Sequence, residues 1–86
     1  MGVAADTGTA LDRHAGQLPA RQRRLLAEAL DGEGEVRISY LDATGTRTSR
    51  VIEPLELDGN SVVAWCRLRD DERRFTLSRI ASVSPA

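Results

Sequence analysis

The chain has 86 residues, 41% of them hydrophobic, and a net charge of −1, which suits one small domain and leaves no room for a second. A single cysteine, Cys66, excludes an internal disulfide framework and indicates a reducing compartment. No apolar run is long enough for a membrane span or a signal-peptide core, so we expect a cytoplasmic protein, with a bacterial setting as the default.

The first sixteen residues, "MGVAADTGTALDRHAG", are small and polar and contain three glycines without a sustained hydrophobic period. This composition predicts a disordered lead-in or linker over residues 1–16, because it offers little apolar surface to offset the entropy of ordering. Residues 17–86 are predicted to form the domain, and removal of the lead-in is expected to leave its stability almost unchanged.

The segment "LPARQRRLLAEALDG" carries helix punctuation, with Pro19 in the first turn and Gly32 just past the end. The pattern predicts one amphipathic helix over about residues 19–31. Its apolar stripe consists of Leu18, Leu25, Leu26, Ala29 and Leu30. The run "RQRR" faces solvent in this interpretation. Contact with DNA phosphates is a second interpretation, but arginines on the polar face of a helix are ordinary.

From Glu35 onward the hydrophobic period changes from that of a helix to that of a strand. The segments "EVRISYL", "RTSRVIEPLEL", "SVVAWCRL", "RRFTLS" and "IASVSP" predict five short antiparallel strands over about residues 35–84. The turns between them include "DATGT" and "DGN", and Pro54 predicts a bulge, bend or edge in the second strand. The fold class is therefore mainly β with one N-terminal helix, closed into a small five-stranded antiparallel barrel. The predicted core contains Leu25, Leu26, Leu30, Ile38, Ile52, Val62, Ala64, Phe75, Leu77 and Ile80.

The stretch "CRLRDDERRFTLSRI" places five arginines among three acids in a chain that is close to neutral. One interpretation is a solvated hairpin, in which Arg69 and Arg73 pair with the acids of the turn and Arg79 pairs with Glu53. The other is an anion site, because the planar guanidinium group matches the oxygens of a phosphate two at a time.

Four segments in order resemble the WYL domain, a bacterial module whose Sm-like, SH3-type barrel follows a helix. These are "ISY" with Gly45 in the next turn, "RVIEP", "VAWC" and "RDDERRFTLSRI". At the position of the Trp-Tyr-Leu triplet that names the family, this chain has Asn60, Ser61 and Val62.

The resemblance implies a sensory module of bacterial transcription regulators and helicase-associated proteins, the actinobacterial versions above all. Such modules bind nucleic acid or nucleotide-like ligands. The family's basic ligand-facing positions and two aromatic motif positions fall on Arg50, Arg69, Arg73, Arg79, Tyr40 and Phe75. Barrel closure is expected to bring the four arginines together, whereas an aromatic residue in a strand belongs to the core more often than to a binding platform.

Trp65 is a further candidate, because it shares strand parity with Arg67 and a ring beside a guanidinium group can stack on a base. The alternative is that Trp65 packs under the helix.

An enzymatic function is not predicted. The sole histidine, His14, lies in the lead-in, and the sole thiol lies on a core strand, so neither a nucleophile with its base nor a metal site can be assembled. No cofactor is predicted either, because phosphate-loop glycine motifs are absent from the sequence.

Two hypotheses of different classes follow. The first is a regulatory module that binds single-stranded nucleic acid or a nucleotide-like anion through its arginines, inside a parent protein and away from membranes. The alternative is a protein-interaction or homo-oligomerisation domain that uses the barrel edge or the helix. High salt weakens arginine–anion binding steeply but leaves an apolar interface largely unchanged.

Overall fold

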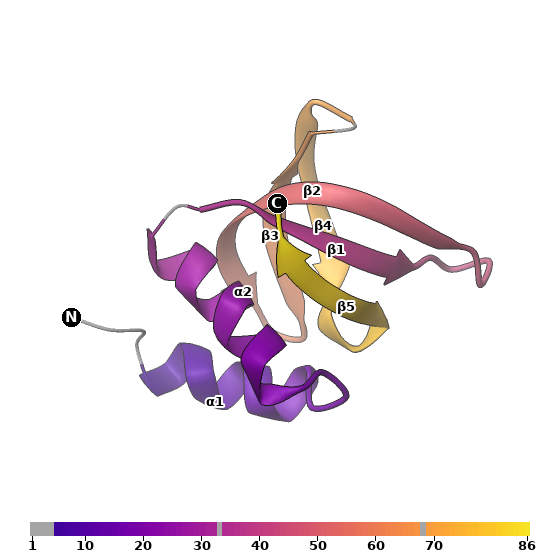
Figure 1. Ribbon diagram of the computed structural model, residues 1–86. Helices are drawn as coiled ribbons and strands as arrows, with labels where there is room; N and C mark the ends of the chain where they lie inside the picture. Colours follow the sequence, from indigo (N-terminus) through magenta and orange to yellow (C-terminus); the bar gives the residue numbers. More distant parts are fainter. Residues whose placement is uncertain (1–4, 33, 68) are drawn as a thin grey trace.

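The structure is a computed structural model that describes residues 5–32, 34–67 and 69–86 (Figure 1). Two helices precede a five-stranded sheet. The elements are α1 Ala5–His14, α2 Ala20–Gly32, β1 Val36–Leu41, β2 Arg47–Asp58, β3 Ser61–Cys66, β4 Asp71–Thr76, the 3-10 helix η1 Leu77–Arg79, and β5 Ile80–Pro85. The predicted five-stranded antiparallel region is confirmed, and so is a helix over nearly the predicted span of residues 19–31.

Helix α2 begins where its sequence punctuation predicts. The carbonyl group of Pro19 accepts hydrogen bonds from the amides of Gln22 and Arg23, at 2.9 and 3.0 Å, so the proline occupies the position before the first helical turn. The helix buries Leu26, Ala27 and Ala29. Its Arg21 and Arg24 face solvent, as the amphipathic pattern predicts.

The prediction of one helix was wrong, because a second helix, α1, forms over Ala5–His14 where the sequence predicted a disordered lead-in. Leu11 is only 1% exposed and Ala15 is fully buried, so this segment is part of the hydrophobic core. Helix α1 packs against α2 and η1. Burial of a leucine contributes about 1.5–3 kcal/mol, which offsets the weak helix propensity of a segment that contains Gly8. The start of the domain at residue 17 stays a prediction.

The five strands form one antiparallel sheet in the order β4-β3-β2-β1-β5. Pro54 lies at the register shift between β2 and β3, so of the predicted alternatives, a bulge, a bend or an edge, the structure has the bulge. Residues that face each other across these strands lie on the same side of the sheet. We call the side that carries Ile38, Ile52, Val62, Ala64 and Cys66 the inner face, because all five residues are fully buried. The opposite side is the outer face.

The predicted closed barrel is not present in the described part of the chain, where β4 and β5 are the two sheet edges and do not pair with each other. Side chains take the hydrogen bonds that a neighbouring strand would make. Gln17 donates to the carbonyl groups of Leu77 and Ile80, both at 2.9 Å, and the side-chain oxygen of Gln22 accepts from the amide of Val83 at 2.8 Å. Helix α2 and the segment before it therefore cover the β5 edge.

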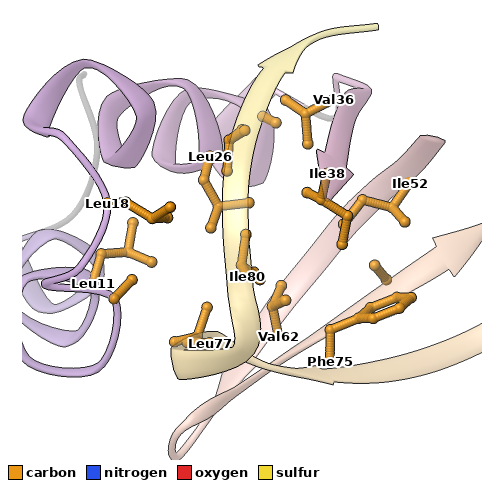
Figure 2. Packing of buried hydrophobic residues seen from close by; sticks show 14 of the residues in the cluster. Leu11, Leu18, Leu26, Val36, Ile38, Ile52, Val62, Phe75, Leu77 and Ile80 are labelled. Carbon is orange, nitrogen blue, oxygen red and sulfur yellow. The ribbon is translucent and has the colours of Figure 1, made fainter. Parts of the chain in front are cut away.

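The core lies between the inner face of the sheet and the two helices (Figure 2). Most of the predicted core residues are buried: Leu26, Ile38, Ile52, Val62, Ala64, Phe75, Leu77 and Ile80. Leu25 and Leu30 are partly buried and pack against this cluster. Figure 2 shows Leu11 and Leu18 on the helical side of the core, beside Leu26 and Leu77. The predicted burial of Cys66 is confirmed.

Candidate anion-binding site

Two of the predicted arginines, Arg50 and Arg73, belong to the inner face of the sheet. Arg50 on β2 is opposite the buried Ile38, and Arg73 on β4 is opposite the buried Ala64. Since opposite residues share a face, both guanidinium groups start from the side that carries the core. Arg50 is half-buried and Arg73 is exposed. The two arginines therefore lie at the margin of the inner face, between the hydrophobic cluster and solvent.

The side chain of Arg50 is held in place by two contacts. Its Nε donates to Oγ1 of Thr48 at 3.3 Å, and its Nη1 lies 3.8 Å from Sγ of Cys66. Cys66 is on β3, so the guanidinium group reaches over the inner face toward the neighbouring strand. Both partners are neutral. The Asp42 carboxylate interacts electrostatically with Arg50 but forms no ion pair with it among the described residues, so the guanidinium group can still attract an anion.

The sheet curls so strongly that β1 meets β4, although these strands are not neighbours in it. The ring of Tyr40 packs edge-on against Phe75, with ring centroids 5.0 Å apart. The Tyr40 hydroxyl group accepts a hydrogen bond from the amide of Thr76 at 3.0 Å. Because Arg73 precedes Phe75 by two residues on the same face, the curl turns Arg73 toward the concave side that also carries Arg50.

Tyr40 therefore joins two strands across the open side of the sheet, and its hydroxyl group is engaged within the fold. Its predicted role in ligand binding stays a prediction for the part of the ring that remains exposed.

Arg79 lies at the end of η1 and contacts the turn between β1 and β2. Its Nη1 donates to the carbonyl oxygen of Asp42 at 3.1 Å. The Asp42 carboxylate accepts from the amides of Thr44 and Thr46, each at 2.9 Å, and from the Thr44 hydroxyl group at 2.7 Å. The hydroxyl hydrogen bond from Thr44 is the largest cause that lowers the pKa of Asp42, and the charge of Arg50 is a smaller one. Asp42 thus interacts with two of the predicted arginines: its carbonyl oxygen accepts from Arg79, and its carboxylate interacts electrostatically with Arg50.

Arg69 lies in the turn between β3 and β4 and is exposed. This turn is tight, with Asp70 at φ 53° and the amide of Asp70 bonded to the carbonyl group of Cys66 at 2.8 Å. No contact of the Arg69 side chain within the described residues fixes its direction, so the structure does not bring it together with Arg50 and Arg73.

The alternative interpretation of these arginines required ion pairs that the structure does not contain. Among residues 5–32, 34–67 and 69–86 the ion pairs are Arg23–Asp12, Arg67–Glu35 and Arg74–Asp58. None of them involves Arg50, Arg69, Arg73 or Arg79. Within this part of the chain, the four predicted arginines therefore have no ion pair with a carboxylate. They share this condition with Arg13, Arg21, Arg24, Arg37 and Arg47.

Trp65 lies on the outer face, away from Arg50 and Arg73. It is half-buried on β3 and stands opposite Glu53 on one neighbouring strand and Glu72 on the other. Its strand neighbour Arg67 is engaged by Glu35 at 2.5 Å. Base stacking by Trp65 stays a prediction, but two flanking carboxylates do not favour the approach of a phosphate.

Sequence reasoning missed three parts of this site: Thr48, Asp42 and the thiol of Cys66 beside Arg50. The segment "DATGT" does carry a signal for Asp42, because an aspartate two residues before a threonine is typical of a side-chain-capped turn. The contact between Asp42 and Arg79 spans 37 residues and has no local signal.

The described residues contain no cluster of three or more His, Cys, Asp or Glu side chains arranged to hold a metal ion. They also contain no helix long and apolar enough to cross a membrane.

Comparison with known families matches residues 22–85, more than half of the chain, to the model of the WYL domain. The chain belongs to the WYL domain family. The match begins inside α2 and ends at the last residue of β5, so it includes Arg50, Arg69, Arg73 and Arg79 but leaves α1 outside. No curated protein sequence matches the chain.

Among solved structures, this WYL domain is similar to proteasome accessory factor B/C (PafBC) of Arthrobacter aurescens, with a TM-score of 0.63 and 22% sequence identity. The similarity covers 99% of this chain but only 12% of PafBC. At this identity the likeness supports the fold, including the segment of α1 that the family model does not cover.

The family's name-giving triplet is replaced here by Asn60, Ser61 and Val62 at the start of β3. Val62 is fully buried in the core opposite Phe75, and Ser61 is 6% exposed. The carbonyl group of Asn60 accepts from the amide of Leu77 at 2.9 Å. These positions therefore have structural roles in this WYL domain, without the two aromatic rings.

Proposed function

We propose that this WYL domain is a non-enzymatic regulatory module that binds single-stranded nucleic acid or a nucleotide-like anion through Arg50, Arg73 and Arg79, with Arg69 as a fourth donor. The observation that carries the proposal is the absence of carboxylate partners for these arginines in the described part of the chain, while Arg67 and Arg74 nearby are paired. A ligand phosphate supplies the missing oxygens.

The arrangement suits a phosphate for two reasons. Arg50 is fixed by Thr48 and Cys66, and Arg79 is fixed by a backbone carbonyl group, so both lose little side-chain entropy on binding. Arg73 is exposed and supplies a donor that adjusts to the ligand. The three donors come from β2, β4 and η1, and the proposal requires that they converge on one backbone phosphate.

The setting is that of a domain in a larger cytoplasmic regulator of a bacterium. The family resemblance supports a role in transcription regulation, and the coverage of only 12% of PafBC supports a module within a longer protein.

The direct test is a titration with a fluorescent single-stranded oligonucleotide and with a fluorescent cyclic nucleotide at 50 and 200 mM salt. If three arginines each neutralise a phosphate, the log–log slope for a single strand is about −2, and affinity falls roughly 20-fold over this range. The absence of binding by both probes, or binding that does not change with salt, contradicts the proposal.

A further inference from the structure

The outer face of the sheet has an apolar centre that is separate from the core. Val63 on β3 is only 8% exposed, yet it is not part of the hydrophobic cluster to which the helices and the inner face contribute. Trp65 lies two residues further along β3, so it points to the same side, and it is half-buried. Val51 on β2 also belongs to this side, because it precedes the inner-face residue Ile52. The outer face therefore offers an apolar strip that the core cluster of the described residues does not use.

The strand register places carboxylates on both sides of Trp65. Glu53 on β2 and Glu72 on β4 are its direct partners in the two neighbouring strands. Glu35 precedes β1 and extends this row next to Glu53, one residue before the first registered pair of β1 and β2. The acidic row across the sheet thus contains three carboxylates and one indole ring. The outer-face patch consists of Val51, Glu53, Val63, Trp65 and Glu72.

Arg67 follows Trp65 on the same side of the sheet and is the arginine closest to the row in sequence. Its Nε donates to Oε2 of Glu35 at 2.5 Å. This hydrogen bond raises the pKa of Arg67, and the charges of Glu35, Glu53 and Asp70 add to the effect. One cation therefore interacts with three carboxylates, which leaves the surroundings of Trp65 with an excess of negative charge.

The other arginines of the outer face lie outside the acidic row. Arg74 is paired with Asp58. Arg37 and Arg47 lie in other cross-strand rows, in the β1–β2 half of the sheet. The two carboxylates beside the indole ring form no ion pair within the described ranges, so they can accept hydrogen bonds from an external cation.

We propose that the outer-face patch binds a basic segment of a protein partner, and that an arginine side chain of this segment lies on the Trp65 ring between Glu53 and Glu72. The face of an indole ring attracts a cation, and carboxylates on two sides accept hydrogen bonds from the planar guanidinium group. Apolar side chains of the partner, next to that arginine, cover Val51 and Val63. Tryptophan at the centre of such a contact is typical of the residues that dominate the energy of a protein interface.

The charge of the patch decides which class of partner fits it. Nucleic acid is disfavoured, because its phosphates meet the carboxylates of the row. A symmetric contact with a second copy is disfavoured for the same reason, since it brings two acidic rows together. A basic protein segment neutralises the row. No residue of the patch belongs to the anion site on the inner face, so the inference stands independently of the proposed function.

The chain contains a single tryptophan, so its intrinsic fluorescence reports on the patch alone. The probe is a synthetic peptide with a central arginine and a valine two residues away on each side, a spacing that places all three on one side of an extended segment. We expect it to change the emission of Trp65 along a saturable curve with a Kd below about 1 mM. The same peptide with citrulline in place of arginine keeps the shape without the charge, and we expect it to bind about fivefold more weakly or less.

Substitutions in the full chain locate the contact. Glu53→Gln and Glu72→Gln are each expected to weaken peptide binding by about threefold or more, because each removes a charge-assisted hydrogen bond. Glu28→Gln is the matched control, since Glu28 is exposed on α2 outside the patch, and it is expected to change affinity by about twofold or less. Trp65→Leu is expected to weaken binding by about fivefold or more, measured by anisotropy of a fluorescein-labelled peptide. Circular dichroism checks folding, and the two glutamine variants at the patch keep the test valid if Trp65→Leu does not fold.

Four results overturn the proposal. One is an emission that does not respond to the arginine peptide up to 1 mM. Equal affinity of the arginine and citrulline peptides is another, and so is binding by Glu53→Gln and Glu72→Gln that equals binding by the Glu28→Gln control. An emission that shifts with protein concentration alone assigns the patch to a second copy. The glutamine variants keep every arginine of the anion site, so a loss of peptide binding is told apart from a loss of oligonucleotide binding.

Discussion

Arg67 and Arg74, on the outer side of the sheet, lie under different conditions from Arg50 and Arg73 on the inner face. On the outer side, Arg74 pairs with Asp58 and Arg67 pairs with Glu35. On the inner face, Arg50 is held by Thr48 and Cys66, and Arg73 has no ion pair within the described ranges. The sequence stretch "CRLRDDERRFTLSRI" thus contributes to both faces, because successive residues of a strand alternate between them.

The number of arginines on a surface therefore does not by itself define a cationic site. A guanidinium group beside a carboxylate has little net field, whereas one held by neutral groups at the edge of an apolar core keeps its field. Arg73 and Arg74 are adjacent in sequence, and strand parity alone places one on each face. Matched substitutions on the inner and outer faces therefore test whether the anion site lies on the inner face.

The largest expected effect concerns the core that supports the inner face. Leu11→Ala is expected to lower the free energy of unfolding by about 2–5 kcal/mol, because Leu11 is 1% exposed and its removal leaves a cavity. Leu55→Ala is the control at an apolar residue that is 46% exposed, where a change of about 0.5 kcal/mol or less is expected. Urea denaturation measures both, and equal losses contradict the assignment of α1 to the core.

The same contrast shows what sequence reasoning can and cannot predict. The strand spans, the start of α2 at Pro19 and the bulge at Pro54 follow from local patterns. Helix α1 does not, because "ADTGTALDRH" contains one large apolar residue, and that residue stabilises the helix only after it meets α2 and η1. The β5 edge is covered by long-range hydrogen bonds that leave no local signal: Gln17 donates to the carbonyl groups of Leu77 and Ile80, and Gln22 accepts from the amide of Val83.

The site was predictable to a similar extent. Strand parity and the family pattern place Arg50 and Arg73 on one face. The contact of Arg79 with the turn at Asp42, and the position of Trp65 between Glu53 and Glu72, require knowledge of the strand register.

The next largest effect is expected at Arg79, at the rim of the site. Arg79→Glu is expected to weaken oligonucleotide or cyclic-nucleotide binding by about tenfold or more, because it removes a charge-assisted contact and adds repulsion. Stability is expected to change by about 0.5 kcal/mol or less, since Arg79 is exposed and contacts only a carbonyl group. Fluorescence anisotropy and urea denaturation on one preparation measure both quantities. Unchanged binding with a large loss of stability means that Arg79 is structural.

A smaller effect is expected on the outer face. Trp65→Phe keeps an aromatic ring on β3, and we expect it to change oligonucleotide affinity by about twofold or less, because Trp65 lies on the face opposite Arg50. Anisotropy titrations measure the affinity. A loss of tenfold or more places the base-stacking surface on the outer face and breaks the comparison between the two faces.

The smallest effect concerns the turn beside Arg79. The pKa of Asp42 is lowered from 3.8, chiefly by the hydrogen bond from the Thr44 side chain, so its contribution to stability is present above 3.8 and is lost as pH falls through the lower folded value. We expect the amide resonances of Thr44 and Thr46 to titrate with a midpoint below 3.8. Asp42→Asn is expected to abolish this titration. A midpoint above 3.8 in the NMR spectra contradicts the described turn.

The most direct measurement compares the neighbours Arg73 and Arg74. Each is changed to glutamate, and the binding of the same single-stranded oligonucleotide is measured at 50 and 200 mM salt. We expect Arg73→Glu to weaken binding by about tenfold or more and to make the salt dependence shallower, because one phosphate contact is lost. Arg74→Glu is expected to change affinity by about threefold or less, since Asp58 already neutralises Arg74 on the outer face. Equal losses for the two variants, or a larger loss for Arg74→Glu, contradict an anion site on the inner face.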